Sequence, residues 1–255
     1  MTSEATHLPL AGVINLDKPV GLTSARAVGQ VKRLLPRGTK IGHAGTLDPF
    51  ATGVLLLLIG KATKSCERLM DCGKQYEATI KLGATTPTDD PESPESPYPV
   101  ATPPAEQAVR AALAQFTGII QQKPPAFSAL RVGGRRAYAL ARKGKPVELQ
   151  PRPVRVDSIE LIRYSWPTLE ISVDCGRGTY IRALARDIGE VLNVGGYLTV
   201  LRRTRVGPFR VEQSCSIESL ARTGVAEALQ PPPTLEPKSH PELMPVPSND
   251  GHATS

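Results

Sequence analysis

The sequence predicts an α+β fold. Segments that alternate like strands and segments with helical spacing follow one another without the regular strand-helix-strand order of a parallel α/β sheet. With 40% hydrophobic residues, the chain of 255 residues can bury a sizeable core. No apolar run approaches the roughly 18–20 residues that cross a bilayer. The longest run, Val54 to Ile59, suits a buried strand.

The elements expected in the N-terminal half begin after residues 1–10, which are predicted to be a flexible lead-in. A helix should start at Thr23 or Ser24, since either side chain can cap it, and end at Pro36. The proline- and threonine-rich stretch 85–104 predicts a surface loop. Strands are predicted at 12–16, 54–59 and 75–82, and further helices at 62–70 and 105–116.

The C-terminal half is predicted to contain one long amphipathic helix, 179–192, whose apolar residues recur at helical spacing. Strands are expected at 154–163 and 169–173, an extended segment at 198–211, and a short helix at 217–221. Proline becomes frequent after Gln230. We therefore expect a folded domain over 11–225 and a disordered proline-rich tail over 226–255.

Positive charge is concentrated in one segment, 121–156, which has nine lysines and arginines against a single acid, Glu148. The pattern there also suggests a short helix at 137–142. The net charge of the chain is +7. A cluster dominated by arginine favours planar contacts with phosphate, so a nucleic acid partner is expected. The alternative is a solvated basic surface that has no partner.

Two classes of site are not expected. The four cysteines form no Cys-x-x-Cys pair, and only His7 and His43 precede the tail, so we expect neither a disulfide framework nor a metal site. The first ten residues lack the features of a signal peptide. The protein is therefore expected to be cytoplasmic, with no membrane partner, and a monomer is assumed.

A glycine-rich stretch, 42–53, places one carboxylate, Asp48, among small and turn-forming residues. Its glycines at 42, 45 and 53 allow positive φ or close approach of a ligand. Pro49 favours an extended conformation at Asp48, which would project the carboxylate from a stiff loop. Such a group can act as a nucleophile or base. It can equally be a polar turn residue that bonds its own backbone.

Seven segments form an ordered set of motifs: GVINLDKPVGLTS (12–24), KIGHAGTLDP (40–49), GKATK (60–64), KQYEA (74–78), QKPPAFSA (122–129), RGTYIR (177–182) and LRR (201–203). In their order and spacing they resemble the bacterial tRNA pseudouridine-55 synthases, the TruB family. Together they cover roughly residues 11–220. The resemblance implies a mixed, largely antiparallel central sheet flanked by helices and loops, with 121–156 as a thumb-like insertion that closes over RNA.

The resemblance also implies an activity: conversion of uridine 55 in the T-loop of tRNA to pseudouridine, with no cofactor or metal. The catalytic aspartate of the family falls on Asp48, which would act as nucleophile or take a sugar proton. Its arginine partner falls on Arg182, which can hold the carboxylate ionised. Tyr76 matches the tyrosine that packs on the target base, which must be extruded from the RNA.

Further positions are implied to contact the substrate. Tyr180 corresponds to a second pocket residue and Leu201 to an apolar lining position, with core packing as the alternative for both. His43 matches a histidine that packs among displaced T-loop bases, unless it only satisfies a local hydrogen bond. Additional RNA contacts are expected at Lys18, Arg202 and Arg131.

The expected tail is too short and proline-rich for the C-terminal RNA-binding domain of the PUA type that many family members carry. Its absence would weaken tRNA affinity and leave the catalytic core intact. Two alternatives to a tRNA-modifying isomerase are a non-catalytic tRNA-folding chaperone and a guide-RNA-dependent relative. Retention of Asp48, Arg182 and Tyr76 argues against an inactive binder, and the compact length argues against the guide-dependent relative.

Overall fold

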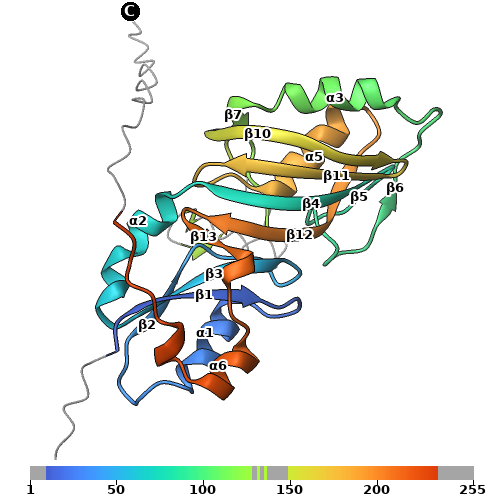
Figure 1. Cartoon of the computed structure of the whole chain (residues 1–255). Helices are drawn as coiled ribbons and strands as arrows, with labels where there is room; N and C mark the ends of the chain where they lie inside the picture. Colours follow the sequence, from blue (N-terminus) through green and yellow to red (C-terminus); the bar gives the residue numbers. More distant parts are fainter. Residues whose placement is uncertain (1–9, 128–130, 133–134, 137–148, 235–255) are drawn as a thin grey trace, which may run out of the picture.

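A single twisted sheet forms the centre of the molecule (Figure 1). The computed structural model describes residues 10–127, 131–132, 135–136 and 149–234. The strands lie in the order β1-β3-β12-β4-β11-β10-β7, with β2 added to β3 and β13 to β12. Their bounds are β1 Gly12–Lys18, β2 Ile41–Ala44, β3 Thr52–Ile59, β4 Lys74–Leu82, β7 Gly118–Gln122, β10 Arg152–Ser165, β11 Thr168–Cys175, β12 Gly196–Val206 and β13 Phe209–Arg210.

Neighbouring strands of this sheet are antiparallel except β3 and β12, which run parallel over two residue pairs. This agrees with the mixed, largely antiparallel sheet that the sequence led us to expect. The pair β3–β12 divides the sheet into two halves. We call β1, β2 and β3 the first half, and β12, β4, β11, β10 and β7 the second half.

The core lies on both faces of β3, which explains its continuous run of apolar residues. Leu55, Leu57 and Ile59 join the large core on one face, while Val54, Leu56 and Leu58 join a smaller core on the other. Helices α1 Ser24–Lys32, α3 Glu106–Ala114, α5 Ile181–Val191 and α6 Ile217–Thr223 contribute to the large core, and α2 Cys66–Asp71 to the small one. A strand buried on both faces has no need of polar alternation.

Most predicted elements are confirmed, with ends that differ by a few residues. Thr23 is the N-cap of α1, since its hydroxyl oxygen accepts a hydrogen bond from Arg26 N at 3.1 Å. The helix predicted at 62–70 is partly wrong. A 3₁₀ segment, η1 Gly60–Ser65, precedes the α-helix α2, because positive φ at Gly60 turns the chain directly out of β3.

The stretch 85–104 is not simply a surface loop. It belongs to a small two-stranded sheet, β5 Ala84–Thr85 with β6 Ser96–Pro97, and between these strands Asp90 is buried. The composition of the stretch gave no sign of this, because the burial depends on an arginine of α5 that is more than 90 residues away.

The basic segment 121–156 is part of the sheet at both of its ends, since Gln122 of β7 pairs with Arg152 of β10. Within it, the two-residue strands β8 Arg131–Val132 and β9 Arg135–Arg136 pair with each other. The short helix considered at 137–142 lies outside the described residues. Past residue 225 the described chain continues through η3 Ala226–Ala228 to Gln230, whose backbone exchanges hydrogen bonds with Val13 of β1.

Candidate active site

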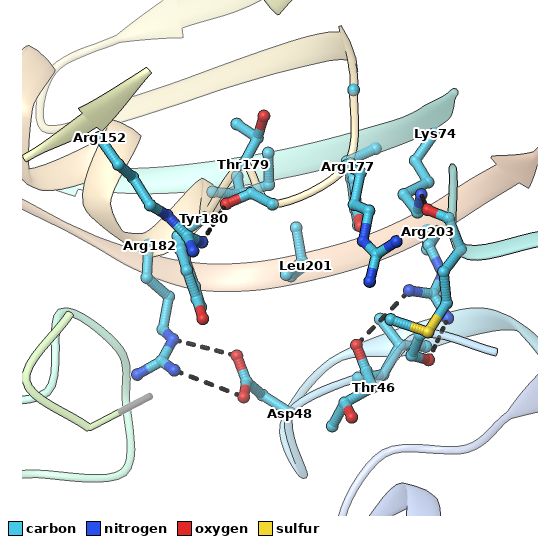
Figure 2. A pocket seen from close by; sticks show the side chains of 17 residues that line it. Thr46, Asp48, Lys74, Arg152, Arg177, Thr179, Tyr180, Arg182, Leu201 and Arg203 are labelled. Carbon is cyan, nitrogen blue, oxygen red and sulfur yellow. Dashed lines mark hydrogen bonds and ion pairs between the residues drawn. The ribbon is translucent and has the colours of Figure 1, made fainter. Parts of the chain in front are cut away.

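A pocket with a volume of about 530 Å³ opens over the junction of the two halves of the sheet (Figure 2). Its size falls in the range of small-molecule sites. One side is formed by the loop before β3, the floor by β4 and β12, and the other side by residues 176–182 at the start of α5. The lining includes the predicted residues Asp48, Tyr76, Tyr180, Arg182 and Leu201, together with Lys74, Arg152, Arg177 and Arg203.

The loop that carries Asp48 is held by its backbone on both sides of the carboxylate. Ser24 Oγ accepts from Leu47 N at 2.9 Å and donates to Leu47 O at 3.0 Å. Pro49 O accepts from Gly21 N at 2.8 Å and from Lys18 Nζ at 3.3 Å. The loop needs glycine at position 45, where φ is +84°. The side chain of Asp48 therefore projects from a fixed backbone, as the sequence predicted.

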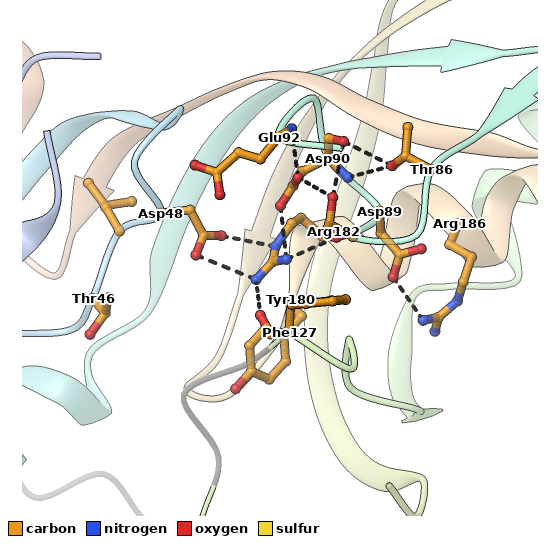
Figure 3. A network of polar contacts seen from close by, with 12 residues as sticks. Thr46, Asp48, Thr86, Asp89, Asp90, Glu92, Phe127, Tyr180, Arg182 and Arg186 are labelled. Carbon is orange, nitrogen blue, oxygen red and sulfur yellow. Dashed lines mark hydrogen bonds and ion pairs between the residues drawn. The ribbon is translucent and has the colours of Figure 1, made fainter. Parts of the chain in front are cut away.

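Arg182 lies at the N-terminal end of α5, only 5% exposed, and faces Asp48. Its Nε is 3.0 Å from Asp48 Oδ2, and its Nη2 donates to Asp48 Oδ1 at 3.4 Å. On its other side Nη1 donates to Asp90 Oδ2 at 2.9 Å, and Nη2 donates to Phe127 O at 2.9 Å (Figure 3). One guanidinium thus joins Asp48 to a second carboxylate and to the start of the basic segment.

Asp90 is a buried partner of Arg182 that sequence reasoning missed. It is 2% exposed, and its Oδ1 accepts hydrogen bonds from Thr88 Oγ1 at 2.5 Å and from Glu92 N at 3.0 Å. Thr86 Oγ1 bonds the backbone of Asp90 at both N and O. The only signal in the sequence is a pair of neighbouring aspartates in a loop rich in proline and threonine, which is also typical of exposed turns.

The side chain of Asp48 is 34% exposed and opens toward the pocket. Burial of its carboxyl raises its pKa, and Arg182 is the main influence in the opposite direction. Asp90 raises the pKa of Asp48 further, while Lys18 lowers it. Arg182 therefore opposes the effect of burial and favours the ionised carboxylate, although the pKa of Asp48 stays above its ordinary value.

Three further side chains form the apolar part of the pocket. Tyr76 of β4 and Leu201 of β12 are buried on the sheet floor, and burial raises the pKa of Tyr76. Tyr180 lies at the opposite wall. Its backbone N donates to Gln122 Oε1 at 2.9 Å, and the Arg152 guanidinium lies 5.3 Å from the centre of its ring. Flat aromatic and apolar surfaces of this kind suit a planar base.

Lys18 is placed differently from its prediction as an RNA contact. It is 0% exposed, and its Nζ donates to the carbonyl oxygens of Pro19, Leu22 and Pro49 at 2.7–3.3 Å. Burial lowers its pKa to about 8. A fully enclosed ammonium cannot reach a phosphate, so the prediction for Lys18 is corrected: this residue holds the backbone of the Asp48 loop.

The remaining predicted RNA contacts lie outside the pocket. His43 is on β2, where burial lowers the pKa of its imidazole. Arg202 points away from Arg203 on the same strand and pairs with Asp17 at 2.9 Å. The backbone of Arg131 lies in β8, and its side chain is outside the described residues.

Among the described residues, no group of three or more histidine, cysteine, aspartate and glutamate side chains has an arrangement that could hold a metal ion. In the same part of the chain, no helix is both long enough and apolar enough to cross a membrane.

The fold and the pocket define a class of protein: a mixed sheet with a pocket over its centre, in which one carboxylate is held by a buried arginine. Two family models cover this architecture. The TruB family pseudouridylate synthase N-terminal domain matches residues 32–181, and the tRNA pseudouridylate synthase B C-terminal domain matches residues 182–231. The chain belongs to the TruB family of pseudouridylate synthases.

Bacterial relatives agree with this assignment. The chain is 47% identical over 214 residues to a tRNA pseudouridine synthase B of Mycobacterium tuberculosis, covering 82% of this chain and 72% of the relative. It is 48% identical over 212 residues to a protein of the same name from Aromatoleum aromaticum, covering 82% and 67%.

Solved structures show the same fold. A Cbf5-Nop10-Gar1 complex contains a chain with 31% identity and a TM-score of 0.65, which covers 86% of this chain and 60% of that one. An H/ACA RNP bound to a substrate RNA containing 2′-deoxyuridine contains another, with 31% identity and a TM-score of 0.61, covering 83% and 52%. This chain thus spans little more than half of those two chains.

Proposed function

We propose that this protein is a tRNA pseudouridine synthase that isomerises uridine 55 in the T-loop of tRNA. The observation that carries the proposal is the pairing of Asp48 with Arg182 at 3.0 Å on the wall of a pocket whose floor is Tyr76 and Leu201. The choice of tRNA and of position 55 is supported by the family and by the names of the bacterial relatives.

The isomerisation gains and loses no atoms. The bond between ribose C1′ and N1 of uracil breaks, the base turns within the pocket, and C1′ bonds to C5, whose proton is then lost while N1 regains one. A base that is stacked within the RNA cannot be reached by Asp48, so it must be extruded. The pocket is closed on one side by the sheet and open on the other, and an extruded base can enter it from the open side. Extruding the base costs about a few kcal/mol, and stacking on Tyr76, which contributes on the order of 1–3 kcal/mol per base, offsets part of that cost.

Asp48 is the group proposed to do the chemistry, as nucleophile toward the ribose or the base, or as base toward a sugar proton. All three roles need an ionised carboxylate with a free lone pair. Arg182 favours the ionised form, and the 34% exposure of the Asp48 side chain leaves it open to the substrate. Arg182 is therefore proposed to hold the nucleophile in its reactive form and orientation.

The basic segment 121–156 is proposed to bind the RNA backbone around the extruded base. Its charge supports this, and so does its attachment, because Arg182 and Arg186 donate to Phe127 O and Lys123 O at the start of the segment. We also propose that the protein acts on tRNA as a monomer in the cytoplasm. The ordered domain is proposed to extend beyond 225 to Gln230, because that residue pairs with β1.

The test is the substitution Asp48→Asn, which keeps the shape of the side chain and removes its charge. We expect pseudouridine formation on an unmodified T-stem-loop RNA to fall below detection while RNA binding stays intact. The measurement is chemical detection of pseudouridine at single-nucleotide resolution, with the dissociation constant measured in parallel. Glu106→Gln, on an exposed turn of α3, is the matched control. Full activity of Asp48→Asn would remove Asp48 from the mechanism, and binding without turnover in the wild type would favour the chaperone.

A further inference from the structure

The two halves of the sheet carry different parts of the site. The first half ends in the loop that holds Asp48, whereas Tyr76 and Leu201 belong to β4 and β12 of the second half. The strands that join the halves, β3 and β12, pair only through Arg202 with Thr52 and Arg203 with Gly53. By contrast, β12 and β4 pair along their whole length. The relative position of carboxylate and base pocket therefore depends on a short parallel ladder.

Arg203 crosses this ladder with its side chain (Figure 2). It belongs to β12, yet its Nε donates to Val54 O of β3 at 2.7 Å. Its Nη2 donates to Gly45 O at 3.2 Å, and its Nη1 contacts Thr46 O at 3.5 Å, the limit of a hydrogen bond. Those two carbonyls lie two and three residues before Asp48. One side chain of the second half thus holds the backbone of the catalytic loop in the first half.

Close approach at residue 53 makes this crossing possible. A Cβ atom at Gly53 would lie 2.2 Å from Arg203 O, and the glycine has a φ of +99°. The backbones of β3 and β12 are in contact where β3 begins. The guanidinium of Arg203 can therefore extend past Gly53 to the loop that carries Asp48. In the register of the sheet, Arg203 lies opposite Tyr76 on β4, and Leu201 is two residues earlier on the same strand.

Stability alone does not account for an arginine at this position. Its side chain is 1% exposed, and among the described residues no carboxylate forms an ion pair with it. Its guanidinium is surrounded by three backbone carbonyls and the side chain of Tyr76. Replacing a buried ionic group by a packed apolar one is often neutral for stability, because burial of the charge is costly. The benefit of the arginine is the fixed fork of donors that reaches three carbonyls.

We infer that Arg203 is a positioning residue for the isomerisation: it fixes the Asp48 loop relative to the base pocket formed by Tyr76 and Leu201. This inference rests on the proposed function. In the proposed reaction, Arg203 contacts none of the reacting atoms. The residue sets the distance between the carboxylate and the extruded base, so its loss should slow the chemical step and leave RNA binding unchanged.

The experiment compares wild type, Arg203→Lys and Arg203→Gln in single-turnover reactions with saturating unmodified T-stem-loop RNA. Both variants lose the three-carbonyl fork, while Arg203→Lys keeps the charge. A misplacement of about 1 Å costs on the order of 10²-fold in rate, and we expect a loss of that order for both variants. The dissociation constant of the RNA, measured by filter binding, should be unchanged. Arg163→Lys, an exposed arginine of β10 paired with Glu170, is the matched control and should keep the wild-type rate.

The pH dependence of the single-turnover rate distinguishes a positioning role of Arg203 from an effect of its charge on the titration of the site. A positioning role lowers the rate of Arg203→Lys at every pH without moving the midpoint of the profile. A wild-type rate in Arg203→Lys, or an equal loss of binding and rate, would overturn the inference. Failure of both variants to fold, seen as loss of the thermal transition, would also overturn it, since Arg203 would then serve stability. A wild-type protein that makes no pseudouridine would instead contradict the proposed function.

Discussion

At the scale of single residues, the site depends on one guanidinium shared by two carboxylates. Arg182 bonds Asp90 on its buried side and Asp48 on its open side. The two carboxylates differ in environment: Asp90 is enclosed and accepts bonds from Thr88 and Glu92, whereas Asp48 faces the pocket. Asp90 therefore fixes the arginine, and the arginine orients Asp48. The three charges form a connected unit, and its exposed member, Asp48, is the one that we propose to be reactive.

The substitution Asp90→Ala should damage both stability and catalysis. It leaves the buried Arg182 with less than its full set of partners, and breaking a buried ion pair costs about 3–5 kcal/mol. It also removes an influence that raises the pKa of Asp48. We therefore expect a lower free energy of unfolding in urea, reduced pseudouridine formation, and a pH profile moved to lower pH.

The matched comparison is Glu106→Ala, which removes an exposed partner of Arg110 on α3. Exposed pairs contribute about 0–1 kcal/mol, so this variant should unfold close to the wild type. An Asp90→Ala protein with wild-type stability and rate would show that Arg182 needs no buried partner.

At the scale of elements, β3 connects the core to the site. Both of its faces are buried, and its first residues meet β12 in the short parallel ladder. The strand can begin there only because residue 53 has no side chain. A methyl group at this position would strike the backbone of Arg203 and would also require a positive φ.

Two glycine substitutions test this element. Gly53→Ala should destabilise the protein strongly, because a Cβ atom would lie 2.2 Å from Arg203 O and neither backbone can move freely. Gly29→Ala, in α1, meets nothing within 4 Å and should raise the free energy of unfolding by about 0.5–1 kcal/mol. Thermal unfolding of both variants is the measurement. Equal stability of the two would mean that the close approach of β3 and β12 is not required.

At the scale of the whole molecule, the positive charge is what should bring RNA to the pocket. The net charge is +7, and two arginines near the pocket are already paired: Arg177 with Glu67 and Asp71, and Arg202 with Asp17. Within the described residues these pairs reduce the charge available to phosphates. The basic segment 121–156, with one acid, is then the main source of attraction.

Binding of tRNA should therefore depend strongly on salt. Each neutralised phosphate releases counterions, so the logarithm of the association constant should fall with the logarithm of salt concentration, by about 0.7–0.9 per phosphate contact. The rate at saturating RNA should change little, because the Asp48 site is held by buried bonds. A titration of affinity and single-turnover rate between low and high salt is the measurement. An affinity that does not respond to salt would leave the basic segment without a role in binding.

Prediction from sequence succeeded where the physical signal is local. Helical spacing identified α5, the run Val54 to Ile59 identified a buried strand, and Thr23 was correctly considered as a cap. It failed where a side chain acts over long sequence distance. Lys18 was expected to bind RNA, but the sequence around a lysine at the end of a strand is the same whether its ammonium is free or enclosed by carbonyls. Asp90 was missed for the same reason.

The sequence by itself determined the class of fold, the family and the central carboxylate, because ordered motifs and apolar periodicity are written along the chain. Only the tertiary structure decided which charges are buried and what they hold: Asp90 on Arg182, Lys18 on Pro49, and Arg203 on the loop before Asp48. Desolvation and hydrogen bonding between distant segments set these roles, and neither exists until the two halves of the sheet come together.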